Sequence, residues 1–180
     1  MLAYLQGLSL GLAYVAPIGV QNLFVINAGL SQPRAAAYRT ALIVIFFDVT
    51  LALAGFFGIG ALIEHSELIR KGVLLAGSLV VMYMGLRLML SREVAGPSIN
   101  VNIPLMKTIG MACVVTWFNP QAIIDVSLLL GSFRVALPPE ESGLFLWGVV
   151  CASCLWFLSL TTISSLFKNR FTPRLLRIIN

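Results

Sequence analysis

The chain has 180 residues, of which 59% are hydrophobic and only 11% are charged. This composition excludes a soluble domain, in which about 25% of residues are charged. The apolar residues fall in blocks of about 20, the length of helix that crosses a bilayer core of about 30 Å. The net charge of +5 does not indicate nucleic-acid binding, because the basic residues lie in short loops between the apolar blocks. We therefore expect an all-α, polytopic membrane protein.

The apolar blocks predict five membrane-spanning helices within a single transmembrane domain that covers residues 1–180. In chain order they are Leu2–Ala28, Thr40–Ile63, Gly72–Leu90, Thr108–Gly131 and Gly143–Phe167. The connection Ser91–Lys107 contains Gly, Pro and Asn residues and is predicted to be a loop. It divides the chain into a first half, residues 1–95, and a second half, residues 104–180. The first block lacks a basic start and is too long for the core of a cleavable signal peptide.

The basic residues in the loops predict the orientation in the membrane. Nine of them fall on one side: Arg34, Arg39, Arg87, Arg92, Lys107, Lys168, Arg170, Arg174 and Arg177. Three fall on the other side, Arg70, Lys71 and Arg134, together with Glu64, Glu67, Glu140 and Glu141. Because Lys and Arg concentrate in cytoplasmic loops, we expect the N-terminus on the outer side of the membrane.

Two of the apolar blocks are interrupted by proline. Pro17 lies in the segment Ala16–Asn22, and Pro120 lies in the segment Trp117–Ala122. Proline breaks at membrane depth are tolerated where the freed backbone faces protein or a cavity. Corresponding breaks in two halves indicate the binding site of a transporter.

The two halves are predicted to form a 3+3 inverted repeat, because the second half enters the membrane from the opposite side. When Pro17 is aligned with Pro120, Asn22 falls opposite Asp125, each five residues after its proline. A 3+3 repeat requires a sixth helix, whereas the tail Lys168–Asn180 supplies only a basic loop and the first residues of a helix. We therefore expect a chain truncated before its last span, with five spans as the alternative.

Asp48 and Asp125 are the acidic residues expected within the spans. An ionisable residue there costs about 2.5–3.5 kcal/mol on insertion scales and is a functional candidate by default. No basic residue is expected at the same depth, so a cationic substrate, a metal ion or a proton would satisfy each carboxyl group. The alternative is that burial keeps the carboxyl group protonated or that polar side chains hydrogen-bond it.

Polar side chains next to the breaks complete the predicted substrate site. Gln21 and Asn22 follow Pro17, and Asn119 precedes Pro120. Their amide groups, with the carbonyl groups that proline frees, can bind the amino and carboxylate groups of an amino acid. The alternative is that they only hydrogen-bond between helices, at about 0.6 kcal/mol for each pair.

Glycine and cysteine residues in the spans have a packing interpretation. Gly7 and Gly11, and later Gly55, Gly58 and Gly60, are predicted to let helices approach closely. Cys151 and Cys154 have the spacing of a redox pair, but cysteine also packs as a small apolar residue. We expect no metal site, no cofactor and no enzymatic activity.

Several of these segments together resemble the LysE-type basic amino-acid exporters. They are Ala16–Asn22, Phe24–Leu30, Phe47-Asp48 near Ala54–Gly58, Thr116–Gln121 with Asp125, Ser127–Gly131, Ala152–Phe157 and Arg177–Asn180. The resemblance covers nearly the whole chain. It implies a bacterial inner-membrane exporter of lysine, arginine or close analogues, driven by the membrane potential or a proton gradient.

The resemblance also ranks the possible functions. The branch of that family that exports neutral amino acids usually has Pro-Gly-Pro where this chain has Pro17-Ile18-Gly19, and Gln21-Asn22 looks more like the basic-substrate branch. An exporter of neutral amino acids is the second possibility, ahead of a membrane thiol–disulfide carrier and a metal-ion exporter. The substrate, the coupling ion and homo-oligomerisation stay open, as does complete transport activity without a last helix.

Overall fold

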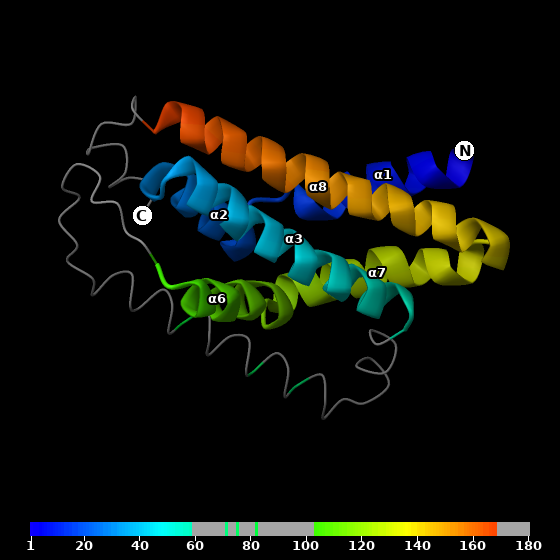
Figure 1. Cartoon of the computed structure of the whole chain (residues 1–180). Helices are drawn as coiled ribbons and strands as arrows, with labels where there is room; N and C mark the ends of the chain where they lie inside the picture. Colours follow the sequence, from blue (N-terminus) through cyan, green and yellow to red (C-terminus); the bar gives the residue numbers. More distant parts are fainter. Residues whose placement is uncertain (59–70, 72–74, 76–81, 83–102, 169–180) are drawn as a thin grey trace.

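The computed structural model describes residues 1–58, 71, 75, 82 and 103–168, and this part of the chain is built of helices (Figure 1). The first group consists of α1 (Leu2–Val15), α2 (Val20–Ser31) and α3 (Arg34–Phe56). The second group consists of α6 (Leu105–Trp117), α7 (Pro120–Ala136), the 3-10 helix η1 (Pro139–Glu141) and α8 (Ser142–Phe167). The predicted all-α fold is confirmed.

Four of the five predicted spans have counterparts among these helices. Helix α3 and the segment Pro139–Phe167 are each long and apolar enough to cross a membrane. Helices α1 and α2 form a pair bent by 80°, and α6 and α7 form a pair bent by 60°. Each bent pair is apolar enough to serve as one broken span. The predicted span Gly72–Leu90, most of the loop before Leu105 and the tail after Lys168 lie outside the described residues.

The predicted bounds of the second span are wrong at both ends. Helix α3 begins at Arg34, directly after Pro33, rather than at Thr40. The segment Arg34–Ala37 is outside the apolar block, but arginine and alanine are strong helix formers. The helix ends at Phe56 rather than Ile63. Gly58 follows with a φ of 98°, a left-handed conformation that glycine adopts without strain.

Helix α8 lies along α1 at a distance that only small residues allow. A Cβ atom added to Gly7 would overlap the carbonyl oxygen of Phe145, and one added to Gly148 would overlap the carbonyl oxygen of Tyr4. Gly11 faces α8 in the same way. Close backbone approach through small residues is a main source of helix association in membranes, so the predicted packing role of Gly7 and Gly11 is confirmed.

The glycines of the second span differ from one another. Gly55 contacts α7, where an added Cβ would overlap the side chain of Val126. Among the described residues, no atom lies within 4 Å of such a Cβ at Gly58, so the described helices do not support its predicted packing role. It ends α3 instead, and Gly60 lies outside the described residues.

The two bent pairs run antiparallel to each other. Helix α1 contacts α7 and helix α2 contacts α6, so the beginning of one pair lies against the end of the other. Each straight helix packs on the bent pair of the other group: α3 packs on α6 and α7, and α8 packs on α1 and α2 (Figure 1). This arrangement brings the two breaks face to face in the interior.

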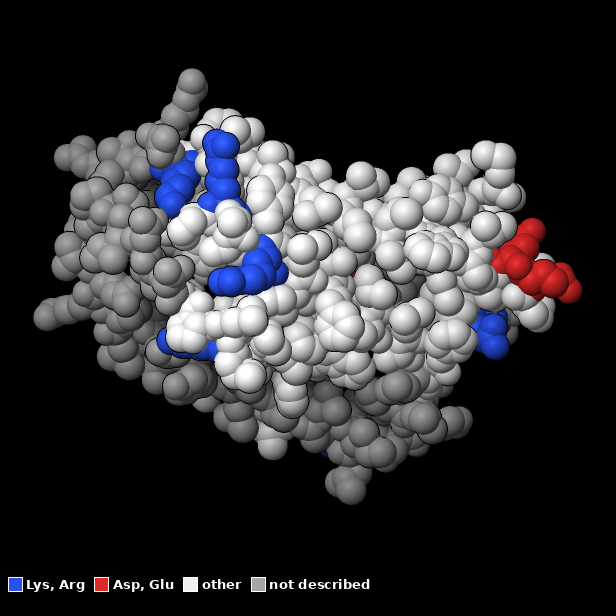
Figure 2. All heavy atoms as spheres, viewed as in Figure 1, with Lys and Arg blue, Asp and Glu red and all other residues white. Residues whose placement is uncertain are grey.

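Charged residues mark the two ends of the helix bundle. Among the described residues, Arg34, Arg39, Lys107 and Lys168 belong to the end where α3 and α6 begin and α8 finishes. Arg134, Glu140 and Glu141 belong to the opposite end, at the close of α7 and in η1. On the face drawn in Figure 2, a belt of uncharged residues lies between these two groups. A bilayer requires few charged side chains on the surface that it covers.

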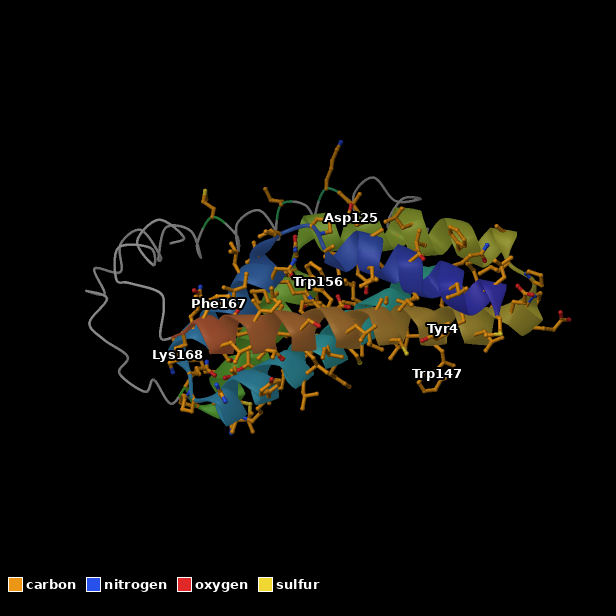
Figure 3. The ribbon with its side chains drawn as sticks, turned by 90° about the horizontal axis from the view of Figure 1, so that it is seen from above. Tyr4, Asp125, Trp147, Trp156, Phe167 and Lys168 are labelled. Atoms are coloured by element: carbon orange, nitrogen blue, oxygen red, sulfur yellow. The ribbon has the colours of Figure 1, made fainter. Side chains whose placement is uncertain are left out.

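Aromatic residues on α8 lie near the two ends of this belt. Trp147 is 65% exposed and Phe167 is 45% exposed, and Figure 3 shows them far apart along α8, with Trp156 between them. The 20 helical residues that separate them rise about 30 Å, which equals the thickness of a hydrocarbon core. Helix α8 therefore has the length of a complete span, and Trp147 is of the residue type that is enriched at membrane interfaces.

Candidate functional site

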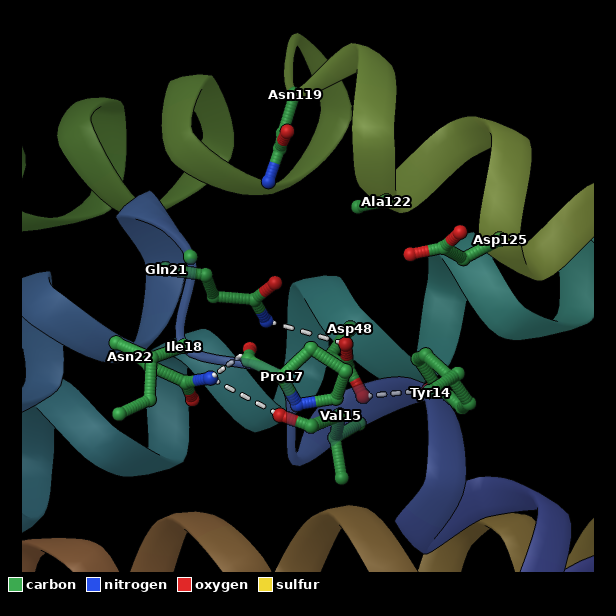
Figure 4. Close-up of a pocket in the computed structure, with 11 residues that line it drawn as sticks. Tyr14, Val15, Pro17, Ile18, Gln21, Asn22, Asp48, Asn119, Ala122 and Asp125 are labelled. Carbon is green, nitrogen blue, oxygen red and sulfur yellow. Dashed lines mark hydrogen bonds between the residues drawn. The ribbon is translucent and has the colours of Figure 1, made fainter.

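A cavity of about 80 Å³ lies between the two helix breaks (Figure 4). One water molecule needs about 10–15 Å³ of such space, so the cavity has room for several water molecules. Its walls come from α1, the two breaks, α2, α3 and α7, and its lining residues are Tyr14, Val15, Pro17, Ile18, Gly19, Gln21, Asn22, Asp48, Asn119, Ala122 and Asp125. The five residues predicted to bind substrate thus surround one cavity, although they come from both halves of the chain.

The first break surrounds Pro17. Helix α1 ends at Val15 and α2 begins at Val20, after Gly19 in an extended conformation. Asn22 holds the break together: its side-chain nitrogen donates to the carbonyl oxygens of Val15 and Pro17, at 3.0 and 2.7 Å. The carbonyl group of Val15 is among those that a helix end leaves without a partner, and the carbonyl group of Pro17 lies in the break itself.

The oxygen of the same Asn22 amide is also paired. It accepts a hydrogen bond from the indole nitrogen of Trp156 on α8, at 3.0 Å. The side chain is 3% exposed, and all three of its hydrogen bonds are made within the protein. In this structure Asn22 stabilises the bend, and a direct contact between Asn22 and a substrate stays a prediction.

Asp48 is buried in the centre of the bundle, 1% exposed. Its carboxyl group accepts hydrogen bonds from the hydroxyl of Tyr14 at 2.8 Å, the hydroxyl of Ser153 at 2.5 Å and the amide of Gln21 at 3.1 Å. The donors lie on α1, α8 and α2, so one side chain of α3 joins four helices. The three donors are neutral, so these contacts supply no positive charge to the carboxylate.

The second break forms the opposite wall of the cavity. Helix α6 ends at Trp117 and α7 begins at Pro120, a position that suits proline because the first helical N–H has no partner inside the helix. Asn119 accepts the first bond of α7 from the backbone N–H of Ile123, at 3.1 Å. Asp125 on α7 is partly buried, and Figure 4 shows its carboxyl group directed into the cavity, facing the side that carries Asp48.

The sequence patterns did not predict the hydrogen-bonding roles of Tyr14, Ser153 and Trp156. Ser153 lies between Cys151 and Cys154, whose spacing is typical of a redox pair. The available signal was weak: each is a single polar group in an apolar span, where an unpaired donor or acceptor is costly.

The cysteine and metal hypotheses gain nothing from the geometry. Cys113, Cys151 and Cys154 are free thiols. In the part of the chain that the structure describes, no group of three or more His, Cys, Asp or Glu side chains could hold a metal ion.

The fold and the cavity define a multi-pass membrane protein with two broken helices around a polar centre, the arrangement of secondary transporters. The sequence matches the family of LysE type translocators over residues 12–180. The chain belongs to this family, and the resemblance found in the sequence motifs is confirmed.

Named relatives have been found in several bacteria. The chain is 32% identical to the arginine exporter protein ArgO of Pectobacterium atrosepticum, over 98% of this chain and 88% of the relative. It is 34% identical to ArgO of Salmonella schwarzengrund and 33% identical to ArgO of Escherichia coli K12, in each case over 98% of this chain and 85% of the relative. No solved structure matches the chain.

Proposed function

We propose that this protein exports basic amino acids, arginine or lysine, across the bacterial inner membrane by secondary active efflux. The observation that carries the proposal is the cavity between the breaks, whose described lining includes two carboxyl groups and neither lysine nor arginine. Such a site attracts a cation. Relatives of this protein are named as arginine exporters.

The amino-acid part of the substrate has a complementary place at the start of α2. The N-terminus of a helix carries N–H groups without partners and a partial positive charge, which favour a carboxylate. Among the described residues, no side chain caps this end of α2. Gly19 lines the cavity with no side chain of its own. The substrate carboxylate would bind at this end, and its side-chain cation would bind near Asp125 and Asp48.

The role of the carboxyl groups can be tested by efflux. Cells loaded with labelled arginine or lysine would be compared for the wild type, Asp48→Asn and Asp125→Asn. Each variant should export at least about tenfold more slowly, the effect of losing about 1.4 kcal/mol of charge stabilisation. Glu140→Gln serves as the control, because this exposed carboxyl group in η1 lies away from the cavity. Unchanged efflux in both aspartate variants would refute the role of the carboxyl groups.

Substrate analogues separate the two ends of the proposed site. Agmatine keeps the guanidinium group of arginine but lacks the carboxylate, and citrulline keeps the carboxylate but lacks the charge on the side chain. Export of arginine without export of either analogue supports both contacts. Export of citrulline at the rate of arginine would favour a different substrate class, neutral amino acids.

A thiol–disulfide carrier and a metal-ion exporter fit the described residues less well. A thiol–disulfide carrier would lose activity when Cys151 and Cys154 are replaced by serine, whereas an amino-acid exporter would retain it. A metal-ion exporter would need the ligand types that its metal prefers, usually several His, Cys or carboxylate groups. The membrane potential or a proton gradient supplies the driving force in our proposal, and efflux in the presence of an ionophore would identify which one.

The antiparallel course of the two bent pairs supports an inverted repeat, residues 1–95 and 104–180, in which one half rocks against the other. The described charges support an N-terminus outside, because four basic residues cluster at the end of the bundle that would face the cytoplasm. Reporter fusions or labelling of a cysteine introduced at Leu2, which is 70% exposed, would test this. If the cysteine is labelled only from the cytoplasmic side, the N-terminus lies inside and the proposed orientation is wrong.

A further inference from the structure

The aromatic residues that precede the two prolines occupy equivalent positions. Tyr14 lies three residues before Pro17, and Trp117 lies three residues before Pro120. Each is therefore one turn upstream of a break, at the end of the helix that the break interrupts. Each also carries one polar hydrogen, which needs a partner at this depth in a membrane.

The hydroxyl groups beside these two aromatic side chains occupy equivalent positions as well. The hydroxyl of Tyr14 lies 3.4 Å from the hydroxyl of Ser153 on α8, and both donate to Asp48. The indole of Trp117 donates to the hydroxyl of Thr50 on α3, at 3.2 Å. Thr50 follows the proline of its own half by 33 residues, and Ser153 follows the proline of its half by the same 33 residues.

We infer that these two contacts, the Tyr14–Ser153 latch and the Trp117–Thr50 latch, are equivalent positioning contacts that decide which face of the membrane the cavity opens to. Each latch ties the broken helix of one half to the straight helix of the other half. The inference rests on the proposed function, since it deepens the account of how the site alternates. The two halves are aligned by their prolines alone. In that alignment Tyr14 falls opposite Trp117 and Thr50 falls opposite Ser153, with no insertion or deletion.

The latches differ in one respect that matters for transport. The Tyr14–Ser153 latch includes the carboxyl group of Asp48, whereas the corresponding position of the second half, 31 residues after its proline, is Cys151. A cation or proton that binds Asp48 therefore acts on one latch and leaves the other unchanged. A ligand shifts a two-state equilibrium only through such a difference between the states.

The symmetry of an inverted repeat gives the inference a distinctive consequence. The operation that exchanges the two halves also exchanges the two faces of the membrane. Loss of one latch should therefore favour opening to one face, and loss of the other latch should favour the opposite face. A contact that only supports the fold has no reason to behave in this way.

The test measures access to the cavity and needs no substrate. Ala122, which lines the cavity, is replaced by cysteine in a chain whose native cysteines are replaced by serine. A membrane-impermeant maleimide is then applied to right-side-out and to inside-out vesicles. The readout is the ratio of the two labelling rates, and the latch variants are Tyr14→Phe and Thr50→Val.

We expect each latch variant to shift this ratio about threefold or more, in opposite directions, because one interhelical hydrogen bond of average strength in a membrane has about that effect on an equilibrium. Thr50→Ser keeps the hydroxyl and should retain the wild-type ratio. The matched control is Thr162→Val, which removes a similar bond between α8 and α3, the one that joins the hydroxyl groups of Thr162 and Tyr38 at 2.8 Å. This control should also leave the ratio unchanged.

Three results would overturn the inference: no shift in either latch variant, shifts in the same direction, or an equal shift in the matched control. Failure of the proposed substrate would be seen separately, in the efflux assay. The labelling ratio would still report whether the two latches are equivalent.

Discussion

Replacement of Asp48 by asparagine and by alanine should separate the charge of this residue from its hydrogen bonds. In Asp48→Asn the side-chain oxygen can still accept from Tyr14 and Ser153, and the new NH2 group would face Gln21. Rotation of the Gln21 amide presents its oxygen to that group and restores the third bond. In Asp48→Ala all three donors lose their acceptor.

The two variants should therefore differ in stability. Three interhelical hydrogen bonds at about 0.6 kcal/mol each amount to a loss of about 2 kcal/mol in Asp48→Ala. Asp48→Asn should remain within about 0.5 kcal/mol of the wild type, because its bonds are kept. The measurement is the free energy of unfolding in mixed detergent micelles as the fraction of denaturing detergent rises.

The rate of transport, unlike the stability, should be similar in the two variants. Both variants lack the carboxylate, so both should export arginine at least about tenfold more slowly per folded molecule. If Asp48→Asn is as unstable as Asp48→Ala, the hydrogen-bond geometry at Asp48 is wrong. If Asp48→Asn exports normally, the charge of Asp48 plays no part in transport.

Two further predictions concern packing and the first break. Gly7→Ala should sharply reduce the amount of folded protein, because the new Cβ meets the backbone of Phe145. Gly110→Ala should be tolerated, since no atom of the described residues lies within 4 Å of its Cβ position, and equal yields of the two variants in membranes would contradict the α1–α8 packing. Asn22→Leu should lower the free energy of unfolding by about 1–3 kcal/mol, because the buried carbonyl group of Val15 and the part-buried carbonyl group of Pro17 lose their donor. It should also shift the fluorescence of Trp156, whose indole loses its acceptor, and an unchanged spectrum with unchanged stability would refute the role of Asn22 in the bend.

Much of the site could be predicted because its residues are unusual where they stand. A proline, a carboxyl group or an amide in an apolar span is visible without any knowledge of the fold. The five predicted substrate-binding residues and Pro17 line one cavity for this reason. The helix bounds were less predictable, because the apolar block reports where lipid lies, whereas α3 begins outside it at Arg34.

The sequence by itself determined the class of protein, the two breaks and the family. These depend on composition and on residues close together in the chain. The tertiary structure decided which side chains satisfy one another: Trp156 binds Asn22 across 134 residues, and Tyr14 meets Ser153 across 139 residues. Such partners are set by which helices pack together and at what height, and no local pattern records that choice. The same packing assigns Asn22 to the bend and Asp48 to the junction of four helices.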